Sequence, residues 1–309
     1  HRRGHFMEQR AIPTTDLKIS VVCLGTMTFG TPVGQGDATK IIHWCLDNGI
    51  NFIDTADMYE GYTRSLGSAG GKSEAYIGSA LKGRRAHAII TTKVGNPIGD
   101  GSYQGTGLGK DHMLHQIDAS LQRLQTDYVD IYEMHTSDTE TPLQESVETM
   151  VGLIDAGKVR YWGFSNFEPS SIRKMISICD ENNWPRPIVA QPTLNWLDRH
   201  SEDEYIPTCG LYNIGVTPYR SLASGMLTGK YQRGQEAPLG SRKEESGWVD
   251  DPSDEVWDRI EEFEREASAA DLSPTQYAVK WIADRPSITS VLVGCKRTDQ
   301  LQPFVELFS

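Results

Sequence analysis

The sequence lacks any long hydrophobic run, since no stretch approaches the roughly 20 apolar residues that a membrane-spanning helix needs. It also lacks the pattern of a signal peptide near its start. Its five cysteines are an odd number without a Cys-x-x-Cys pair, so neither a zinc knuckle nor a disulfide framework is indicated. We therefore expect a soluble, cytoplasmic protein with buried, reduced thiols and no metal.

Positive charge is also scarce. The chain has 30 Lys and Arg against 42 Asp and Glu, which gives a formal net charge of −12 and a pI near 5.1. The basic residues are scattered, whereas nucleic acids and anionic membranes are bound through a basic face. This composition argues against either as the main partner.

No Gly-x-Gly-x-x-Gly follows a predicted strand, so a Rossmann domain is not indicated. After a predicted hairpin at 10–19, short apolar strands instead alternate with helices along the chain. The strands are predicted at 20–26, 51–56, 88–94, 128–134, 159–165, 188–193, 215–221 and 290–295. The helices are predicted at 37–48, 73–82, 114–124, 141–157, 169–179, 202–212, 256–267 and from 273 onward. Thr141 and Ser273, each followed by Pro and with Gln three residues later, are predicted helix caps.

Eight short parallel strands that alternate with helices favour a closed (β/α)8 TIM barrel, and 309 residues suffice for one such domain. We assign residues 7–309 to this single domain. The basic segment His1–Phe6 precedes Met7, and we interpret it as a leader outside the fold.

Four chemically active side chains follow neighbouring strands. The strand at 51–56 delivers Asp54, with Tyr59 just beyond it. Lys93 ends the next strand, and His135 follows the fourth. Considered alone, each residue could have a purely structural role, as Asp54 could in a turn. Because active sites of such barrels lie at the carboxyl ends of the strands, we expect one pocket to hold all four. A lysine beside a tyrosine lowers the pKa of the phenol, which would make Tyr59 a general acid.

These residues and their surroundings resemble the aldo-keto reductase family over nearly all of residues 8–301. The resemblance rests on Asn-Phe-Ile-Asp-Thr-Ala at 51–56 with Tyr59, Ser73-Glu74, Thr92-Lys93, Asp127-Tyr128 leading to His135, Gly157-Lys158-Val159-Arg160, Ser165-Asn166-Phe167, Gln191, Asn195 and Leu222–Lys230. It implies a reductase that binds NADPH across the barrel mouth, the end where the strands terminate. In that family the tyrosine, here Tyr59, donates a proton to the substrate oxygen. Lys93 would tune the tyrosine, Asp54 would pair with Lys93, and His135 would orient the carbonyl.

The resemblance also implies a set of cofactor-binding residues. For the nicotinamide these are Ser165, Asn166 and Gln191, with Tyr219 stacked on its ring. The remaining expected contacts are Gly25, Thr26, Met27 and Asp54 early in the chain, Arg220, Ser221, Leu222, Ser224, Gly225 and Lys230 near the pyrophosphate, and Gly294, Lys296, Arg297 and Gln300 near the adenosine. Two cations before a helix suit the extra phosphate of NADPH, which favours it over NADH.

Some positions depart from the family pattern. Arg220-Ser221 replaces the usual Ser-Pro before Leu222, and Pro303 and Phe304 stand where adenine contacts are usual. The chain also ends at Ser309, about one helix into the eighth unit, so we expect a short C-terminal segment.

The substrate pocket is predicted to be largely apolar and to accept aldehydes or ketones as small-molecule partners. Its expected lining is Met27, Phe29, Tyr62, Arg64 and Trp196. The sequence does not indicate the oligomeric state.

Two alternatives remain open. The branch that the chain most resembles, judged by Asn195 with Asp198-Arg199, includes potassium-channel β-subunits, which suggests a nucleotide-binding regulatory protein with slow turnover. A metal-dependent hydrolase with ligands Asp54, Asp57 and His135 is less favoured, since such sites need several converging ligands. The only near histidine pair, His112 and His115, lies on a helix expected to face solvent.

Overall fold

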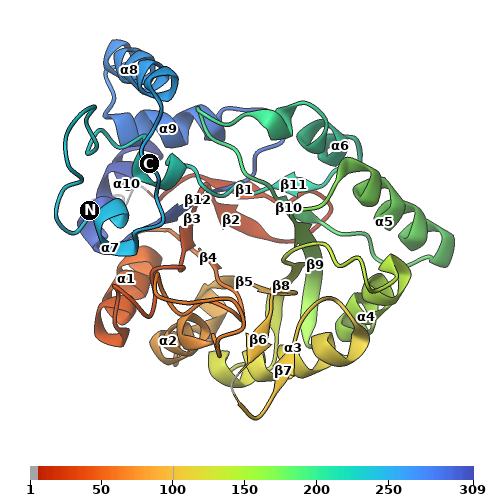
Figure 1. Cartoon of the computed structure of the whole chain (residues 1–309). Coiled ribbons are helices and arrows are strands. Elements are labelled where there is room, and N and C mark those ends of the chain that lie inside the picture. Colours follow the sequence, from red (N-terminus) through yellow and green to blue (C-terminus); the bar gives the residue numbers. More distant parts are fainter. Residues whose placement is uncertain (1–5, 100) are drawn as a thin grey trace, which may run out of the picture.

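The computed structural model describes residues 6–99 and 101–309, and its centre is a sheet of eight parallel strands (Figure 1). The order is β11-β10-β9-β8-β5-β4-β3-β12. These strands are β3 (Val22–Gly25), β4 (Phe52–Asp54), β5 (Ile89–Val94), β8 (Val129–Met134), β9 (Val159–Ser165), β10 (Val189–Gln191), β11 (Gly215–Val216) and β12 (Val291–Gly294). Each lies within a predicted strand, because the short apolar runs suit strands that are buried on both faces.

Hydrogen bonds between β11, β12 and the residues that flank them close the sheet. The Val216 N–H donates to the Ser287 carbonyl at 3.1 Å, and its own carbonyl accepts from the Thr289 N–H at 2.8 Å. Just beyond, the Leu292 N–H donates to the Pro218 carbonyl at 3.1 Å. The predicted closed (β/α)8 barrel is therefore confirmed.

Helices cover the outside of the barrel (Figure 1). They are α1 (Gln35–Asp47), α2 (Lys72–Ala80), α3 (Lys110–Leu124), α4 (Leu143–Asp155), α5 (Pro169–Asn182), α6 (Tyr205–Leu211), α7 (Arg242–Ser246), α8 (Asp254–Ala269), α9 (Pro274–Ala283) and α10 (Gln302–Leu307). Four 3-10 turns add η1 (Arg85–His87), η2 (His200–Glu202), η3 (Ala223–Gly225) and η4 (Thr298–Gln300). The main helices bury one apolar stripe each, as Ile260, Phe263 and Ala267 do on α8. No helix in the described ranges is long and apolar enough to cross a membrane.

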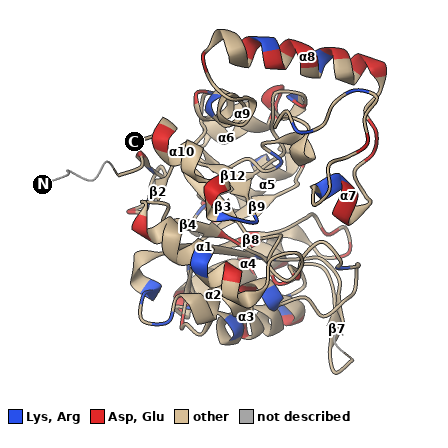
Figure 2. Cartoon of the chain, turned by 90° about the vertical axis from the view of Figure 1, so that its left-hand side faces the viewer, with Lys and Arg blue, Asp and Glu red and all other residues tan. Residues whose placement is uncertain are grey.

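An antiparallel hairpin, β1 (Gln9–Ala11) and β2 (Lys18–Ser20), packs under the barrel, as predicted. Ile12, Leu17 and Ile19 from this hairpin are buried in one cluster with Cys23 and Phe52 from the barrel strands. The side view shows β2 on one side of the molecule and α7 and β7 on the other (Figure 2). The hairpin therefore fills the lower end and leaves the carboxyl ends of the strands free. Of the leader assigned to residues 1–6, only Phe6, which is exposed, lies within the described residues.

Three local predictions were wrong or incomplete. The loop after β5 contains a second hairpin, β6 (Ile98–Gly99) with β7 (Gln104–Gly105), and the loop after β11 contains α7. Thr141 does not cap α4, whose N-cap is Pro142 without a side-chain hydrogen bond. The Thr141 hydroxyl instead bonds to Asp138. The capping box of Ser273 and Gln276 on α9 is confirmed.

Gly163 tests how closely the strands must approach. A Cβ at this position would lie 2.3 Å from the carbonyl oxygen of Val189 on the neighbouring strand. We expect Gly163→Ala to lower the free energy of unfolding by about 1–3 kcal/mol, since overpacking forces the backbone to shift. Gly152→Ala on α4, where a Cβ meets nothing within 4 Å, is the control and should add about 0.5–1 kcal/mol. Urea unfolding measures both, and equal stabilities would contradict the prediction.

Candidate active site

The structure brings the four predicted residues together at the barrel mouth. Lys93 on β5 donates from Nζ to Asp54 Oδ1 on β4 at 2.6 Å and to the Thr55 carbonyl at 2.9 Å. Its Nζ lies 3.4 Å from the Tyr59 hydroxyl and 5.0 Å from the centre of that ring. The His135 ring meets Tyr59 edge to face, with 5.9 Å between ring centres. A phenol, an ammonium, a carboxylate and an imidazole thus share one site.

Lys93 and Asp54 form an ion pair inside the protein, with 0% and 1% of their side chains exposed. The second carboxylate oxygen of Asp54 accepts from Gln191 Nε2 at 2.8 Å, so both oxygens are bonded. Burial lowers the pKa of Lys93, but the neighbouring groups, led by the Asp54 carboxylate, together raise it by more, and the net pKa is raised. Lys93 therefore remains a cation that is fixed in position.

The pKa of Tyr59 differs from the prediction. Burial raises the pKa of this phenol, and nearby Lys93 lowers it by less, so the net pKa is raised from the ordinary value of tyrosine. The sequence suggested the opposite direction because it does not show how far the hydroxyl is removed from water. In the resting protein Tyr59 is protonated, which is the form that can donate a proton.

His135 is half-buried and neutral. Burial lowers the pKa of its imidazole well below the usual value, and the cations Lys93 and Arg64 lower it further. Its backbone carbonyl accepts from the Asn166 side chain at 3.0 Å, and its Nδ1 is buried without a partner among the described residues. A neutral imidazole carries one N–H, which can donate to a carbonyl oxygen.

The residues predicted to bind nicotinamide extend this site along β9, β10 and β11. Ser165 Oγ donates to the Gln191 carbonyl at 2.7 Å, which joins these two residues to the Asp54 network. Tyr219 donates from its hydroxyl to Asn166 Oδ1 at 2.8 Å, and Asn166 is exposed. Early in the chain, Thr26 Oγ1 donates to the Asp54 carbonyl at 2.7 Å.

The residues predicted to bind phosphates gather on one side of the mouth. Ala223, Ser224 and Gly225 in η3 have consecutive positive φ values of 50°, 57° and 91°, an irregular backbone that leaves no room for a side chain on Gly225. Burial lowers the pKa of Lys230, and Lys296, Arg242 and Arg297 lower it further, which shows that four cations lie close together. Such a cluster suits a phosphate-bearing cofactor.

The remaining members of the predicted cofactor set have structural contacts. Ser221 Oγ donates to the Leu292 carbonyl at 2.7 Å, and Gln300 Oε1 accepts from the Lys296 N–H at 2.7 Å. Lys296 also pairs with Glu245 at 2.6 Å, and Arg297 pairs with Asp299 at 3.0 Å. The residues that are half-buried are Gly25, Met27 and Leu222, and those that are exposed are Arg220 and Gly294.

Two predicted pocket residues are not brought to this site. Phe29 is fully buried in the main core. Trp196 packs with Leu227 and Phe263 in a separate cluster, and its indole N–H donates to Glu266 at 2.9 Å. Aromatic character alone did not reveal that these rings face the core. Met27, Tyr62 and Arg64 are half-buried, and their place in the substrate pocket stays a prediction.

One buried acid beside the site was not singled out from the sequence. Glu133 on β8 stands opposite Lys93 in the strand register, is 0% exposed, and has no hydrogen-bond partner for either carboxylate oxygen among the described residues. Burial raises its pKa well above the ordinary value. An acid within the apolar run at 128–134 was the available signal.

A second network lies beside Tyr59. Asp57 is fully buried and accepts from Gln116 Nε2 at 2.8 Å, while Gln116 Oε1 lies 3.0 Å from His115 Nδ1. The expectation that His112 faces solvent was wrong, since it is 7% exposed and stacks with Tyr103 at 5.8 Å between ring centres. The described residues hold no cluster of three or more metal-ligating side chains.

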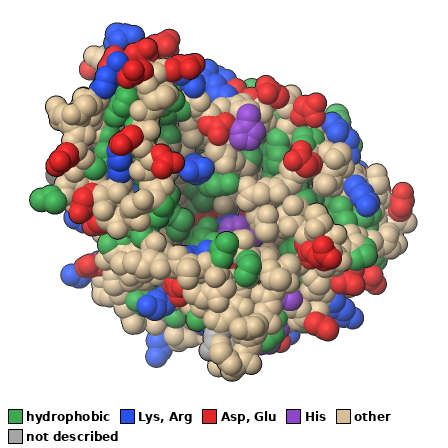
Figure 3. Space-filling view, viewed as in Figure 1, with side chains coloured by type: hydrophobic (Ala, Val, Ile, Leu, Met, Phe, Trp, Pro, Cys, Tyr) green, Lys and Arg blue, Asp and Glu red, His purple; other side chains and the backbone are tan. Residues whose placement is uncertain are grey.

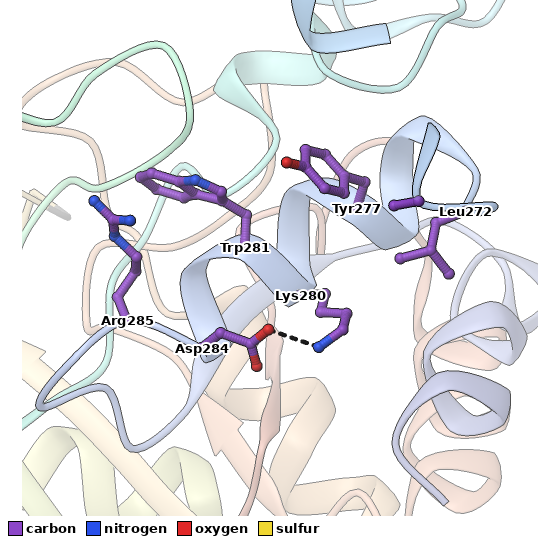
Figure 4. Close-up of a pocket in the computed structure, with 7 residues that line it drawn as sticks. Leu272, Tyr277, Lys280, Trp281, Asp284 and Arg285 are labelled. Carbon is purple, nitrogen blue, oxygen red and sulfur yellow. Dashed lines mark hydrogen bonds and ion pairs between the residues drawn. The ribbon is translucent and has the colours of Figure 1, made fainter. Parts of the chain in front are cut away.

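The molecular surface is hollowed near the centre of the face seen in Figure 3, where histidine and basic side chains show among hydrophobic ones. A different pocket of about 350 Å³ lies on the outside, against α9 (Figure 4). It is lined by Ala270, Leu272, Tyr277, Lys280, Trp281, Asp284 and Arg285. Its charged groups are paired, as in the 2.6 Å contact of Lys280 with Asp284. None of the four predicted catalytic residues lines this pocket.

Comparison with known proteins agrees with the geometry. The profile of the Aldo/keto reductase family matches residues 21–309. A probable voltage-gated potassium channel subunit beta from Arabidopsis thaliana is 32% identical over 96% of this chain and 89% of its own length. The uncharacterized oxidoreductase YrpG from Bacillus subtilis is 30% identical over 97% and 90%. The structure of a glycerol dehydrogenase from Gluconobacter oxydans superposes with a TM-score of 0.82 at 28% identity, over 97% of this chain and 90% of that one.

The chain therefore belongs to the aldo/keto reductase family. It is an oxidoreductase of a family that uses nicotinamide cofactors on small carbonyl compounds. The branch predicted from the sequence is confirmed, since the relatives include both potassium-channel β-subunits and bacterial oxidoreductases.

Asp57 predicts a pH dependence of stability. Burial and nearby Glu74 raise its pKa from 3.8 to about 7. Between these values the folded protein holds a proton that the unfolded chain releases, so stability is full at low pH and is lost as pH rises toward 7. Across this window the free energy of unfolding of the wild-type protein should fall by up to about 4 kcal/mol. Asp57→Asn, which keeps an acceptor for Gln116, should abolish this fall. Urea unfolding from about pH 4 to pH 7 measures the slope.

The control is Asp203→Asn, which changes an exposed residue directly after η2. It should follow the wild-type slope. A slope for Asp57→Asn that equals the wild-type slope would show that Asp57 is ionised in the folded protein.

Proposed function

We propose that this protein reduces aldehydes or ketones to alcohols with NADPH, using Tyr59 as the proton donor. The observation that supports this most directly is the protonated Tyr59 hydroxyl 3.4 Å from the buried Lys93 ammonium, with the neutral His135 ring at its edge. The substrate is a small carbonyl compound, and a cytoplasmic location suits an acidic protein of this kind.

Each side chain of the site has a separate role in the proposed reaction. Bound NADPH supplies the hydride that reaches the carbonyl carbon. Tyr59 transfers its proton to the carbonyl oxygen, and Lys93 stabilises the negative charge that develops on the phenol oxygen. Asp54 and the Thr55 carbonyl hold Lys93 in place. His135, kept neutral, donates a hydrogen bond that orients and polarises the carbonyl.

The choice of NADPH rests on the cations around η3 and η4. Lys296 and Arg297 would hold the adenosine phosphate, and Lys230 would face the pyrophosphate, where the backbone of Ser224 and Gly225 lies beside it. Among the described residues, the ion-pair partner of Arg297 is exposed Asp299, an arrangement that a doubly charged phosphate can displace.

A regulatory role is the second candidate. It is suggested by the potassium channel β-subunit relative, which is 32% identical to this chain. The same four residues would be present in a regulatory protein with slow turnover. Steady-state rates of reduction of many carbonyl compounds therefore distinguish the enzyme from the regulatory protein. Rapid reduction of any of them favours an enzyme, while tight nucleotide binding with negligible turnover favours regulation.

Tyr59→Phe tests the mechanism. Removal of the proton donor should lower the rate of carbonyl reduction by at least about 100-fold, as expected for loss of a general acid. NADPH affinity, measured by quenching of intrinsic fluorescence, should stay near the wild-type value because the ring is kept. Wild-type turnover in this variant would refute the role of Tyr59.

Arg297→Leu tests the cofactor preference. Loss of a charge-assisted contact with the adenosine phosphate should weaken NADPH binding by about 10-fold or more and leave NADH binding unaltered. Arg186→Leu, which removes an exposed arginine paired with Asp180 at 2.6 Å, is the control. Equal weakening of both nucleotides would argue against the 2′-phosphate contact.

A further inference from the structure

Arg64 has unsatisfied hydrogen-bond donors close to the reacting groups. It lies in the loop that follows β4, five positions after Tyr59, and its side chain is half-buried. Its Nε and Nη2 are buried and have no hydrogen-bond partner among the described residues. Buried donors of a charged group are nearly always paired, because leaving them unpaired costs free energy. The guanidinium is thus built to receive an acceptor that the chain does not supply.

The acids near Arg64 are already bonded elsewhere. Glu60 accepts from the Ser68 hydroxyl and, at 3.2 Å, from the Gly70 N–H. Asp57 accepts from Gln116, and burial raises its pKa to about 7, which favours its neutral form. Neither carboxyl group therefore neutralises the guanidinium through a direct hydrogen bond.

The charge of Arg64 also affects His135, a residue that a bound substrate would contact. This charge lowers the pKa of His135 together with Lys93, and burial lowers the pKa of the Arg64 guanidinium itself, which nearby Glu60 offsets only in part. The imidazole thus lies within the field of two cations. Lys93 donates to Asp54 and to the Thr55 carbonyl, whereas Nε and Nη2 of Arg64 have no acceptor within the part of the chain that the structure describes.

The loop that carries Arg64 is anchored on the mouth side of the barrel. The Tyr62 N–H donates to the Thr31 carbonyl at 2.7 Å, and the Tyr62 hydroxyl accepts from Arg242 Nε at 3.2 Å. The Tyr62 ring also meets Trp248 edge to face at 6.2 Å. Contacts from the segment at 231–252 thus hold Tyr62, two positions before Arg64, while Arg242 itself is engaged by these rings.

We propose that Arg64 is an anion subsite that binds a carboxylate on the substrate, so that the preferred carbonyl compounds are aldehydes or ketones bearing a carboxylate separate from the reacting carbonyl. This inference rests on the proposed reductase function. The planar guanidinium can bind both carboxylate oxygens at once, which would fix the carbonyl relative to Tyr59 and His135. The predicted apolar pocket then carries one specific charged contact.

Matched substrates test this proposal. We would compare kcat/KM for 3- and 4-formylbenzoate with those for their methyl esters, which keep the ring and aldehyde and remove the charge. Wild-type protein should prefer at least one acid over its ester. Arg64→Met should lower the acid-to-ester ratio by about 10- to 100-fold, as expected for loss of a charge-assisted hydrogen bond. Arg64→Lys, which keeps the charge but loses the planar fork, should give an intermediate ratio.

Two further measurements separate the possible failures. Arg233→Met removes a surface arginine paired with Asp258 at 2.5 Å and should keep the wild-type ratio. Binding of 3- and 4-(hydroxymethyl)benzoate, the alcohol products, by calorimetry needs no turnover and should weaken in both Arg64 variants. An acid-to-ester ratio and product affinity unaltered by Arg64→Met would overturn the proposal.

Weaker NADPH binding in Arg64→Met with an unaltered acid-to-ester ratio would also overturn it and assign Arg64 to the cofactor. Absence of reduction of both acids and esters by the wild-type protein would count against the proposed function. Calorimetry would then still decide the carboxylate subsite, since product binding that depends on Arg64 supports it and binding independent of Arg64 refutes it.

Discussion

The buried contact between Lys93 and Asp54 is the constraint on which the site depends. Two charges without access to water are tolerated only when each is bonded on several sides. Here the Thr55 carbonyl and Gln191 complete the bonding, and Ser165 connects Gln191 to the next strand. The ion pair therefore links β4, β5, β9 and β10, and any movement of these strands would leave a buried charge unpaired. Lys93 in turn contacts the Tyr59 hydroxyl, and the Tyr59 ring meets His135 edge to face.

Burial and charge act in opposite directions on the phenol, and the balance explains its chemistry. Desolvation keeps Tyr59 protonated, while the fixed ammonium of Lys93 favours the phenolate that forms once a proton leaves. Buried Glu133, with a raised pKa, adds no permanent negative charge opposite Lys93. In the mechanism that we propose, the interior thus keeps the proton on Tyr59 and stabilises the phenolate that its transfer would leave, which a surface tyrosine beside a lysine could not do.

The barrel and the four central residues were predictable because both depend on local signals. Short apolar strands show the alternation of the fold, and the barrel geometry then brings the residues after β4, β5 and β8 to one end. What depended on three-dimensional burial was not predictable. The sequence could not show that desolvation outweighs Lys93 at Tyr59, that Phe29 and Trp196 face the core, or that His112 is covered by Tyr103. Glu133 was overlooked because glutamate is rarely found fully buried, so its position in a buried strand did not suggest a role.

The loops over the mouth follow a different rule from the barrel beneath them. Below, the buried Asp54 carboxylate and Lys93 ammonium are paired. Above, Nε and Nη2 of Arg64 have no acceptor among the described residues, and Arg242 and Lys296 are held by contacts with the loops themselves. Groups needed in one fixed position gain from complete bonding, because alternatives are then costly. Groups that exchange a protein contact for a ligand are better left unpaired or in exposed ion pairs, because breaking an exposed ion pair costs little free energy. The unequal pairing of charges therefore separates the residues that hold the chemistry in place from those suited to selecting what is bound.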